Sequence, residues 1–294
     1  MSDRLNELIP SWVRHLRARN LAPRTIKSYE GSAWEFAIAC ADPKADEITQ
    51  AMLEEYFEAL MKRTSASNAA TSYRRLQQLF RWLLEEGEIN DSPMRRMSPP
   101  QVPEVPIPIV GPTDIKALLA ACEGTRFEDR RDAAIVRVLL DTGIRASELV
   151  GLEVDDIDWD YNVLTVLGKG RKPRSVPFGT KTSEALDRYL RARRQHIYAD
   201  LPDLWIGAKH AITASGVTQM IERRCARAGI DPIGLHRFRH TAAHEWLAAG
   251  GQEGDLEMLM GWAKSSGMTR RYGRSAAAER ARDAHRRLGL GDRY

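Results

Sequence analysis

A dense run of prolines divides this chain of 294 residues into two parts. Seven of the 14 prolines fall within residues 93–112. Each proline removes a backbone N–H donor and restricts the residue before it, so neither a helix nor a central strand fits there. We therefore predict an extended linker over residues 91–112, a smaller domain over residues 1–90 and a larger domain over residues 113–294.

The first domain is predicted to be a four-helix bundle, because apolar side chains recur at helical spacing in four blocks. The blocks are Leu5, Leu8, Trp12 and Leu16; Ile26, Tyr29, Ala33 and Ala37; Leu53, Phe57 and Leu60; and Leu76, Leu79, Phe80 and Leu83. Thr25 and Thr49 are candidate N-caps, and Gly87 is a candidate helix stop.

The second domain is predicted to be mainly helical with a small antiparallel sheet. A helix over residues 132–140 is expected to stop at Gly143. Alternation over residues 163–167 predicts a strand, the sequence GKGRKPR predicts a tight turn, and residues 175–178 are expected to form the returning strand. After Thr180 the chain is predicted to be mostly helical.

Composition excludes several classes of protein. No apolar run approaches the roughly 20 residues of a membrane span. The three cysteines lie far apart without a CxxC pair, which predicts neither a disulfide framework nor a cysteine zinc site. The first residues lack a basic stretch followed by an apolar core, so we expect a cytoplasmic protein with no membrane partner.

Positive charge gathers in two segments of the second domain, although the net charge of the chain is only +4. Residues 161–199 hold nine basic and two acidic side chains, and residues 264–294 hold nine basic and three acidic ones. Such clustering favours a polyanionic partner such as DNA. Solvated helix faces are the alternative explanation.

Four short motifs carry residue types that suit phosphate chemistry. They are TGIRASEL around Arg145, GKGRKPR around Lys169, HRFRH over residues 236–240 and MTRRYG around Tyr272. Arg145 and Glu148 lie three apart at a helix start, where the carboxylate can hold the guanidinium. His236 and Arg239 share a helix face, and an imidazole beside a five-donor cation suits a phosphate.

Each motif alone also has an ordinary explanation. The first would be a surface ion pair, the third a basic helix face, and the charges of GKGRKPR would make nonspecific contacts with DNA. GKGRKPR lacks the spacing of a Walker loop, which argues against nucleotide hydrolysis. His240 and His244 lack the glutamate of an HExxH site, so we predict no bound metal.

Taken in order, the four motifs resemble those of the tyrosine recombinases, or phage integrases, and in particular the two-domain Xer-like members. GIRASEL is similar to the family's first-arginine motif, GKG to its hairpin lysine, HRFRH to its HxxRH motif, and LMGWAKSSGMTRRY to the segment that ends in the nucleophilic tyrosine. The stretches LAPRTIKSYEGSAWEF and SYRRLQQLFRWL resemble the family's SAM-like core-binding bundle. The resemblance implies that bundle followed by a mostly helical catalytic domain.

The resemblance also implies a role for each motif residue. Arg145 and Arg239 would bind the scissile phosphate. Lys169 would protonate the leaving 5′-oxygen, His236 would act as an acid or base or donate to the phosphate, and Tyr272 would attack. These roles agree with the chemistry, because guanidiniums bind phosphate oxygens well and nearby cations ease the loss of a phenol proton.

Three further residues belong to this expected site. Glu148 and His240 would hold neighbouring side chains. Trp262 stands where many family members have histidine, and an indole can only donate a hydrogen bond or pack. The interval from Trp262 to Tyr272 is also about one residue longer than the family's usual spacing.

We therefore predict a site-specific DNA recombinase that cuts and rejoins strands through a 3′-phosphotyrosine. Such an ester retains the phosphodiester bond energy, so no cofactor, ATP or metal is expected. The resemblance implies double-stranded DNA with short core sites as the substrate, a homo-tetramer that passes through a Holliday junction, and accessory proteins as further partners. The alternatives are a type IB-like DNA topoisomerase, which would act as a monomer, and a non-enzymatic DNA-binding protein on the same fold.

Overall fold

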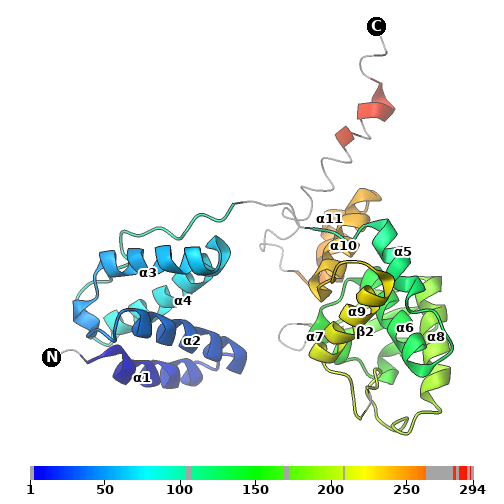
Figure 1. Ribbon diagram of the computed structural model, residues 1–294, viewed down its shortest axis with the longest axis horizontal. Helices are drawn as coiled ribbons and strands as arrows, with labels where there is room; N and C mark the ends of the chain where they lie inside the picture. Colours follow the sequence, from blue (N-terminus) through cyan, green and yellow to red (C-terminus); the bar gives the residue numbers. More distant parts are fainter. Residues whose placement is uncertain are drawn as a thin grey trace. The chain divides into compact units, whose positions relative to one another are not determined.

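The computed structural model of the chain comprises two compact units, Met1–Val105 and Pro106–Tyr294 (Figure 1). It describes residues 3–103, 108–168, 172–207 and 209–262, together with residues 281–282, 285–289 and 292. None of the helices in these ranges combines the length and the apolar character that crossing a membrane requires.

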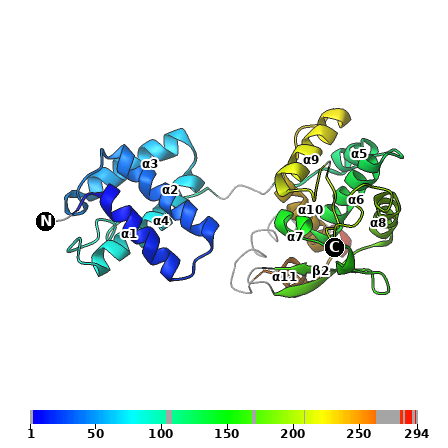
Figure 2. The ribbon, with the colours of Figure 1, turned by 90° about the horizontal axis from the view of Figure 1, so that it is seen from below.

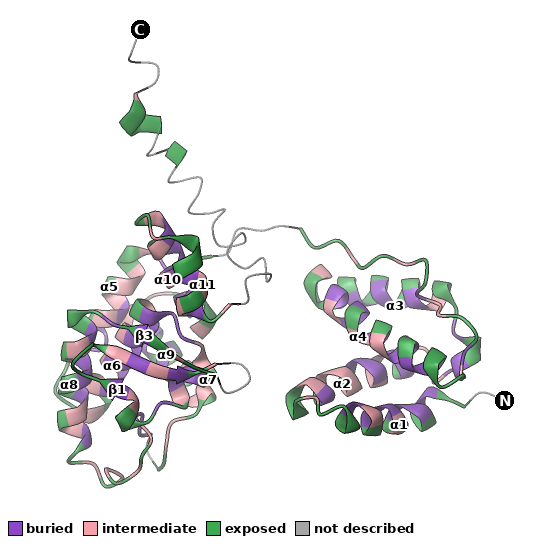
Figure 3. Cartoon of the chain, turned by 180° about the vertical axis from the view of Figure 1, so that it is seen from behind, coloured by how far each residue is buried: buried purple, intermediate pink, exposed green. Residues whose placement is uncertain are grey.

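The first unit contains the predicted four-helix bundle. Its helices are α1 (Leu5–Ala18), α2 (Pro23–Ala39), α3 (Gln50–Arg63) and α4 (Ala66–Glu85). Residues from all four helices form one buried core. Figure 3 shows buried residues on each of these helices. Phe36 of α2 meets Phe80 of α4 edge-on with 6.0 Å between ring centroids, and Trp12 of α1 stacks on Tyr29 of α2. The apolar spacing therefore identified the face that each helix buries.

Of the three helix ends predicted in this unit, those at Thr49 and Gly87 are confirmed and the one at Thr25 is wrong. Thr49 is the N-cap of α3, and its hydroxyl accepts a hydrogen bond from the Met52 N–H at 3.3 Å. Thr25 is not a cap, because α2 already begins at Pro23, whose fixed φ favours the first helical position. Gly87 follows the end of α4 with φ +78°, as a helix stop should.

The second unit is mainly helical, as predicted. Its helices are α5 (Pro112–Ala120), α6 (Phe127–Thr142), α7 (Ala146–Val150), α8 (Thr180–Arg193), α9 (Ala214–Ala228), α10 (Leu235–Ala248) and α11 (Glu253–Met260), with a 3₁₀ turn over Val154–Asp156. α6 packs along α8 and α10 and supplies much of the core, as its side-by-side course with α8 in Figure 1 illustrates. α6 stops at Gly143 in the left-handed conformation, at the predicted residue.

Three antiparallel strands form the one sheet of the described chain, in the order β1–β2–β3. The predicted hairpin consists of β2 (Val163–Leu167) and β3 (Pro173–Pro177), and Leu164 pairs with Val176 in the interior. The strand β1 (Ile157–Asp158) was not predicted, because two residues carry no periodicity. Figure 2 shows α11 beside this sheet, and α11 contacts β3. The hairpin tip, residues 169–171, lies outside the described residues.

Exposed arginines of α8 pair with acidic residues of the same helix. Arg188 lies 3.6 Å from Glu184, and Arg191 lies 3.0 Å from Asp187. These pairs have the i, i+4 spacing of a solvated helix surface. This part of the basic segment over residues 161–199 is therefore compatible with the solvated-face explanation.

Candidate active site

Arg145 and Glu148 form a compact unit at the start of α7. Arg145 is the N-cap residue of this helix, and its backbone N–H donates to Glu148 Oε2 at 2.8 Å. Arg145 Nη1 donates to Glu148 Oε1 at 2.8 Å. The carboxylate thus satisfies a backbone donor of the helix start and fixes the arginine side chain, which remains half-buried.

Glu148 also binds a second arginine, which comes from β3. Arg174 donates from Nη1 to Oε1 at 2.9 Å and from Nη2 to Oε2 at 2.8 Å, a bidentate pair with a carboxylate whose side chain is only 3% exposed. Burial alone would raise the pKa of Glu148, but the hydrogen bonds from Arg174 and Arg145 outweigh it and lower this pKa to about 2. Glu148 is therefore an anion that holds two guanidiniums at fixed positions.

Arg239 of α10 lies in the interior of the unit, with 2% of its surface exposed. Its Nη1 donates to the Gly143 carbonyl at 2.8 Å and its Nη2 to the Met260 carbonyl at 2.6 Å. Gly143 and Met260 lie at the C-terminal ends of α6 and α11, where carbonyl groups lack partners within the helix. Two helix ends therefore orient this guanidinium.

Arg145 and Arg239 approach the same turn of the chain. Arg145 Nη2 lies 3.4 Å from the carbonyl oxygen of Gly261, the residue after Met260. Trp262 follows directly, and the Arg239 guanidinium carbon lies 5.3 Å from the centre of its ring. Trp262 thus packs on the arginine as a cation–π partner, which is one of the two roles open to an indole at this position.

His236 and His240 share a face of α10. Their ring centroids lie 4.5 Å apart with an interplanar angle of 73°, and His236 is the exposed member of the pair. His236 is on the same helix as Arg239, three residues earlier. Of the eight residues assigned to the expected site, the structure describes six: Arg145, Glu148, His236, Arg239, His240 and Trp262.

Lys169 and Tyr272 lie outside the described residues. The second unit contains other tyrosines that could compete with Tyr272 as the nucleophile, and the structure describes Tyr161, Tyr189 and Tyr198 among them. Tyr189 is fully buried, donates to the Leu204 carbonyl at 2.8 Å, and has a pKa raised to about 12, with burial as the main cause. Such a phenol cannot reach a DNA strand. Tyr161 is 80% exposed and follows β1, so it remains a testable rival.

Arg174 is the residue of this site that sequence reasoning missed. It belongs to GKGRKPR, for whose charges nonspecific contact with DNA is the alternative explanation. That interpretation is wrong for Arg174, because its side chain is only 13% exposed and binds Glu148. The available signal was its position in a strand next to a motif lysine, but the partner lies 26 residues earlier in the chain.

Comparison with known proteins now decides the family. The model of the phage integrase family matches residues 109–279, and that of the N-terminal SAM-like domain of phage integrases matches residues 8–88. This chain belongs to the phage integrase family. The two matched segments lie in the two units of the structure, and the resemblance to Xer-like tyrosine recombinases is confirmed.

Individual relatives extend over almost the whole chain of this family member. Tyrosine recombinase XerC of Thermodesulfovibrio yellowstonii is 28% identical over 267 residues, which are 88% of each protein. The crystal structure of XerA recombinase is 26% identical, covers 95% of this chain and 98% of its own, and has a TM-score of 0.54.

Two structures of lambda integrase share the fold at 16% identity. A dimer of its residues 75–356 bound to a COC′ core site has a TM-score of 0.76 and covers 92% of this chain and 95% of its own. A tetramer bound to a Holliday junction has a TM-score of 0.75 and covers 90% of this chain and 79% of its own.

The lowered pKa of Glu148 predicts a stability that depends on pH. A folded-state pKa of about 2, against an ordinary value of 4.5, stabilises the fold fully above pH 4.5, and this contribution is lost as the pH falls toward 2. At about 1.4 kcal/mol per pKa unit, the contribution is roughly 3 kcal/mol. In urea unfolding, Glu148→Gln protein should be much less stable than wild type at pH 7, with a difference that is smaller near pH 3 and nearly absent near pH 2. An equal difference at both pH values would contradict this origin.

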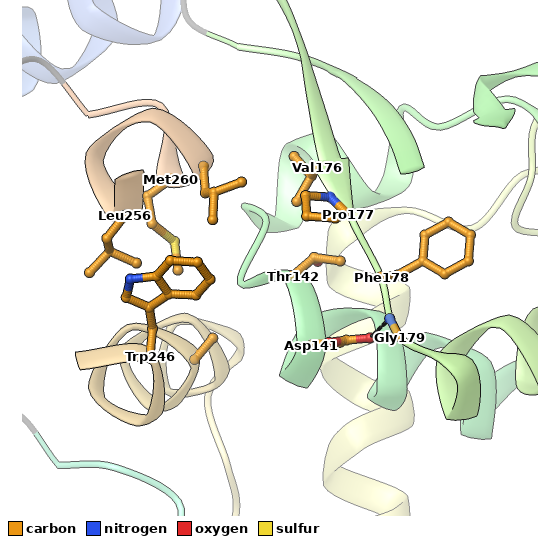
Figure 4. Close-up of a pocket in the computed structure, with 11 residues that line it drawn as sticks. Asp141, Thr142, Val176, Pro177, Phe178, Gly179, Trp246, Leu256 and Met260 are labelled. Atoms are coloured by element: carbon orange, nitrogen blue, oxygen red, sulfur yellow. Dashed lines mark hydrogen bonds between the residues drawn. The ribbon is translucent and has the colours of Figure 1, made fainter. Parts of the chain in front are cut away.

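Gly143 is predicted to tolerate alanine poorly, because its φ is +59° and an added Cβ would lie 2.6 Å from Met260 Cε and 3.0 Å from Ala242 Cβ. Met260 lines a cavity of about 220 Å³ into which its long side chain can shift (Figure 4), whereas the Cβ of Ala242 is attached directly to the α10 backbone. We expect Gly143→Ala to cost about 1–2 kcal/mol for the left-handed backbone and about 1–3 kcal/mol for overpacking.

The matched control for this prediction is Gly229, which ends α9 with φ +68° and has nothing within 4 Å of an added Cβ. Gly229→Ala should therefore show the backbone cost alone. Urea unfolding of both variants measures the difference. Equal losses of stability would show that the contacts of Gly143 add nothing to the cost.

Proposed function

We propose that this family member is a site-specific DNA recombinase whose nucleophile is Tyr272. The observation that carries the proposal is the convergence of Arg145 and Arg239 on the carbonyls of residues 261 and 260. These residues directly precede Trp262 and the segment with Tyr272. Two guanidiniums held at the start of that segment are suited to bind the phosphate that the tyrosine attacks.

The proposed reaction exchanges one phosphodiester for another. The Tyr272 oxygen forms a bond to the scissile phosphorus as the bond to the 5′-oxygen breaks, and its phenol proton leaves to a base, with His236 as the candidate. Lys169 gives a proton to the departing 5′-oxygen. A 5′-hydroxyl from another strand then attacks the 3′-phosphotyrosine and gives its proton to Lys169, the bond from phosphorus to the tyrosine oxygen breaks, and the phenolate takes back the proton held by the base, so the sequence balances without ATP.

The described residues are suited to stabilise the negative charge that develops on the phosphate during the reaction. Charge builds on the nonbridging oxygens in the transition state, and charge donors that are already in place stabilise it without reorganisation. Glu148 fixes Arg145, and the carbonyls of two helix ends orient Arg239. Both guanidiniums are thus held in place before DNA arrives.

We propose double-stranded DNA with short core sites as the substrate and four copies of this chain as the working assembly. The lambda integrase complexes with a core site and with a Holliday junction support this proposal through the shared fold. Within it, residues 1–90 bind the core site, residues 113–294 carry the chemistry, and the linker predicted over residues 91–112 joins them, although its last residue, Pro112, already begins α5. We also propose a cytoplasmic location and accessory proteins as further partners.

The test is to trap the covalent intermediate and identify the attached residue. Wild-type protein is incubated with a fragment library of the DNA that flanks its gene, and the fragments that stay attached in SDS are sequenced. Cleavage after glutamate then yields a peptide of residues 258–279, in which Tyr272 is the one tyrosine. We expect one short site in the DNA and a nucleotide mass on this peptide.

Other outcomes would overturn the proposal. Attachment through a different tyrosine would remove Tyr272 from the mechanism. Trapping at scattered sequences would favour the topoisomerase. If no adduct forms even on nicked duplexes, which lose the cleaved fragment and cannot religate, the protein only binds DNA.

A further inference from the structure

We propose that Arg174 is a positioning residue for the reaction, which couples the β2–β3 hairpin to Arg145 and to the end of α11. The inference rests on the proposed function. Arg174 lies in β3, paired with Val166 of β2, five residues after Lys169. The strand that leads away from the motif lysine therefore carries an arginine with a partner deep in the unit.

The first half of this coupling runs through Glu148. Each of its carboxylate oxygens accepts one hydrogen bond from Arg174 and one from Arg145: Oε1 from the side chains of both, and Oε2 from the Arg174 side chain and the Arg145 backbone. Because the two arginines share both oxygens, a shift of Arg174 moves the carboxylate that fixes Arg145. The side chain of Glu148 is buried and only 13% of the Arg174 side chain is exposed, so water offers little substitute.

The second half runs through the α11 end, residues 259–261. Arg174 Nε donates to the Leu259 carbonyl at 2.9 Å, Arg239 donates to the Met260 carbonyl at 2.6 Å, and Arg145 lies 3.4 Å from the Gly261 carbonyl. Three arginines from three elements thus hold three successive carbonyls. Cations at a helix C-terminus are electrostatically favourable, and these carbonyls lack partners within the helix.

Gly261 gives independent support for this arrangement. It has φ +60°, and an added Cβ would lie 3.1–3.3 Å from three atoms of the Arg174 guanidinium. The guanidinium therefore packs directly against the backbone of the α11 end. Since its hydrogen bonds to Glu148 and Leu259 prevent easy movement, the two groups fix each other.

The contacts of Arg174 distinguish positioning from direct catalysis. Its guanidinium forms a bidentate pair with the Glu148 carboxylate, which neutralises its charge, and its Nε donates to the Leu259 carbonyl. Arg145 also binds Glu148, but 36% of its side chain is exposed to solvent. Arg174 thus acts through Arg145 and the α11 end.

The test compares single-turnover adduct formation by full-length wild-type and Arg174→Lys proteins, on a nicked duplex with the core site recovered by trapping. Lysine keeps the charge but cannot bind both Glu148 oxygens and the Leu259 carbonyl at once. We expect DNA affinity close to wild type and an adduct rate lower by about 10- to 100-fold, the range that a misplaced catalytic group produces. Arg191→Lys, at an exposed arginine of α8, should match wild type.

A double-mutant cycle with Arg145→Lys separates coupling from a general structural effect. If Arg174 acts through Arg145, the rate losses of the two single variants should not multiply in the double variant. Losses that multiply fully, or an Arg174→Lys rate equal to wild type, would overturn the inference. If the lysine variant does not fold, Gly261→Ala displaces the guanidinium with every charge retained and should also slow adduct formation; an unchanged rate would be equally adverse.

The wild-type control keeps this inference apart from the proposed function. If wild-type protein forms no adduct at Tyr272, the proposed function fails. If wild-type protein forms the adduct and the Arg174 variants form it equally fast, the proposed function stands and the positioning role of Arg174 fails.

Discussion

Replacing Tyr272 by phenylalanine is expected to abolish covalent attachment to DNA and to leave DNA binding unchanged. The substitution removes one hydroxyl and keeps the ring, so the shape and charge of the DNA-binding surface are preserved. Where a nucleophile and its partners act as one unit, loss of the nucleophile costs on the order of 10⁶-fold in rate. The measurement is SDS-stable adduct on the nicked core-site duplex, beside a binding titration at fixed salt concentration.

Tyr161→Phe is the matched control for this experiment. Tyr161 is the most exposed tyrosine among the described rivals, whereas Tyr189 is fully buried and hydrogen bonded to the Leu204 carbonyl. The Tyr161 variant should form adduct at the wild-type rate. Adduct formation by the Tyr272 variant at an undiminished rate would contradict the proposed mechanism. A loss of adduct in the Tyr161 variant alone would identify Tyr161, which lies between β1 and β2, as the nucleophile.

The parts of the molecule that were predictable from sequence depend on neighbours in the chain. Helical spacing identified the bundle of the first unit, and strand alternation identified the β2–β3 hairpin. The Arg145–Glu148 pair was predictable for the same reason, because three residues of separation on a helix start bring the two side chains together. Such contacts follow from the periodicity of a helix or a strand, which can be read from a single sequence.

The remaining contacts of the site join residues far apart in the chain. Arg174 meets the Leu259 carbonyl across 85 positions, and Arg145 approaches the Gly261 carbonyl across 116. The acceptors are backbone oxygens, which every residue possesses, so no side-chain pattern identifies them. A resemblance to a family supplied Arg239 as a phosphate ligand, but only the packed structure shows the two helix ends that orient it.

Arg239→Lys is predicted to slow adduct formation by about 10²- to 10³-fold, the cost of losing one charge donor that is already in place in such a site. Lysine keeps the charge, but its single ammonium cannot span the Gly143 and Met260 carbonyls and still cover the ring of Trp262. A buried carbonyl left without its donor also costs about 1–3 kcal/mol, so the variant should unfold at a lower urea concentration. Both quantities are measured on the same preparation.

Arg224→Lys separates the two effects. Arg224 is another buried arginine of the same unit, and it binds Asp132 at 2.7 Å, Asp129 at 2.9 Å and the Ala121 carbonyl at 2.8 Å. Its replacement should lower stability by a similar amount, yet adduct formation per folded molecule should remain at the wild-type rate. Equal rate losses in the two variants would mean that general destabilisation explains the Arg239 effect. A selective loss at Arg239 would show that the two helix-end carbonyls orient a guanidinium needed for the chemistry.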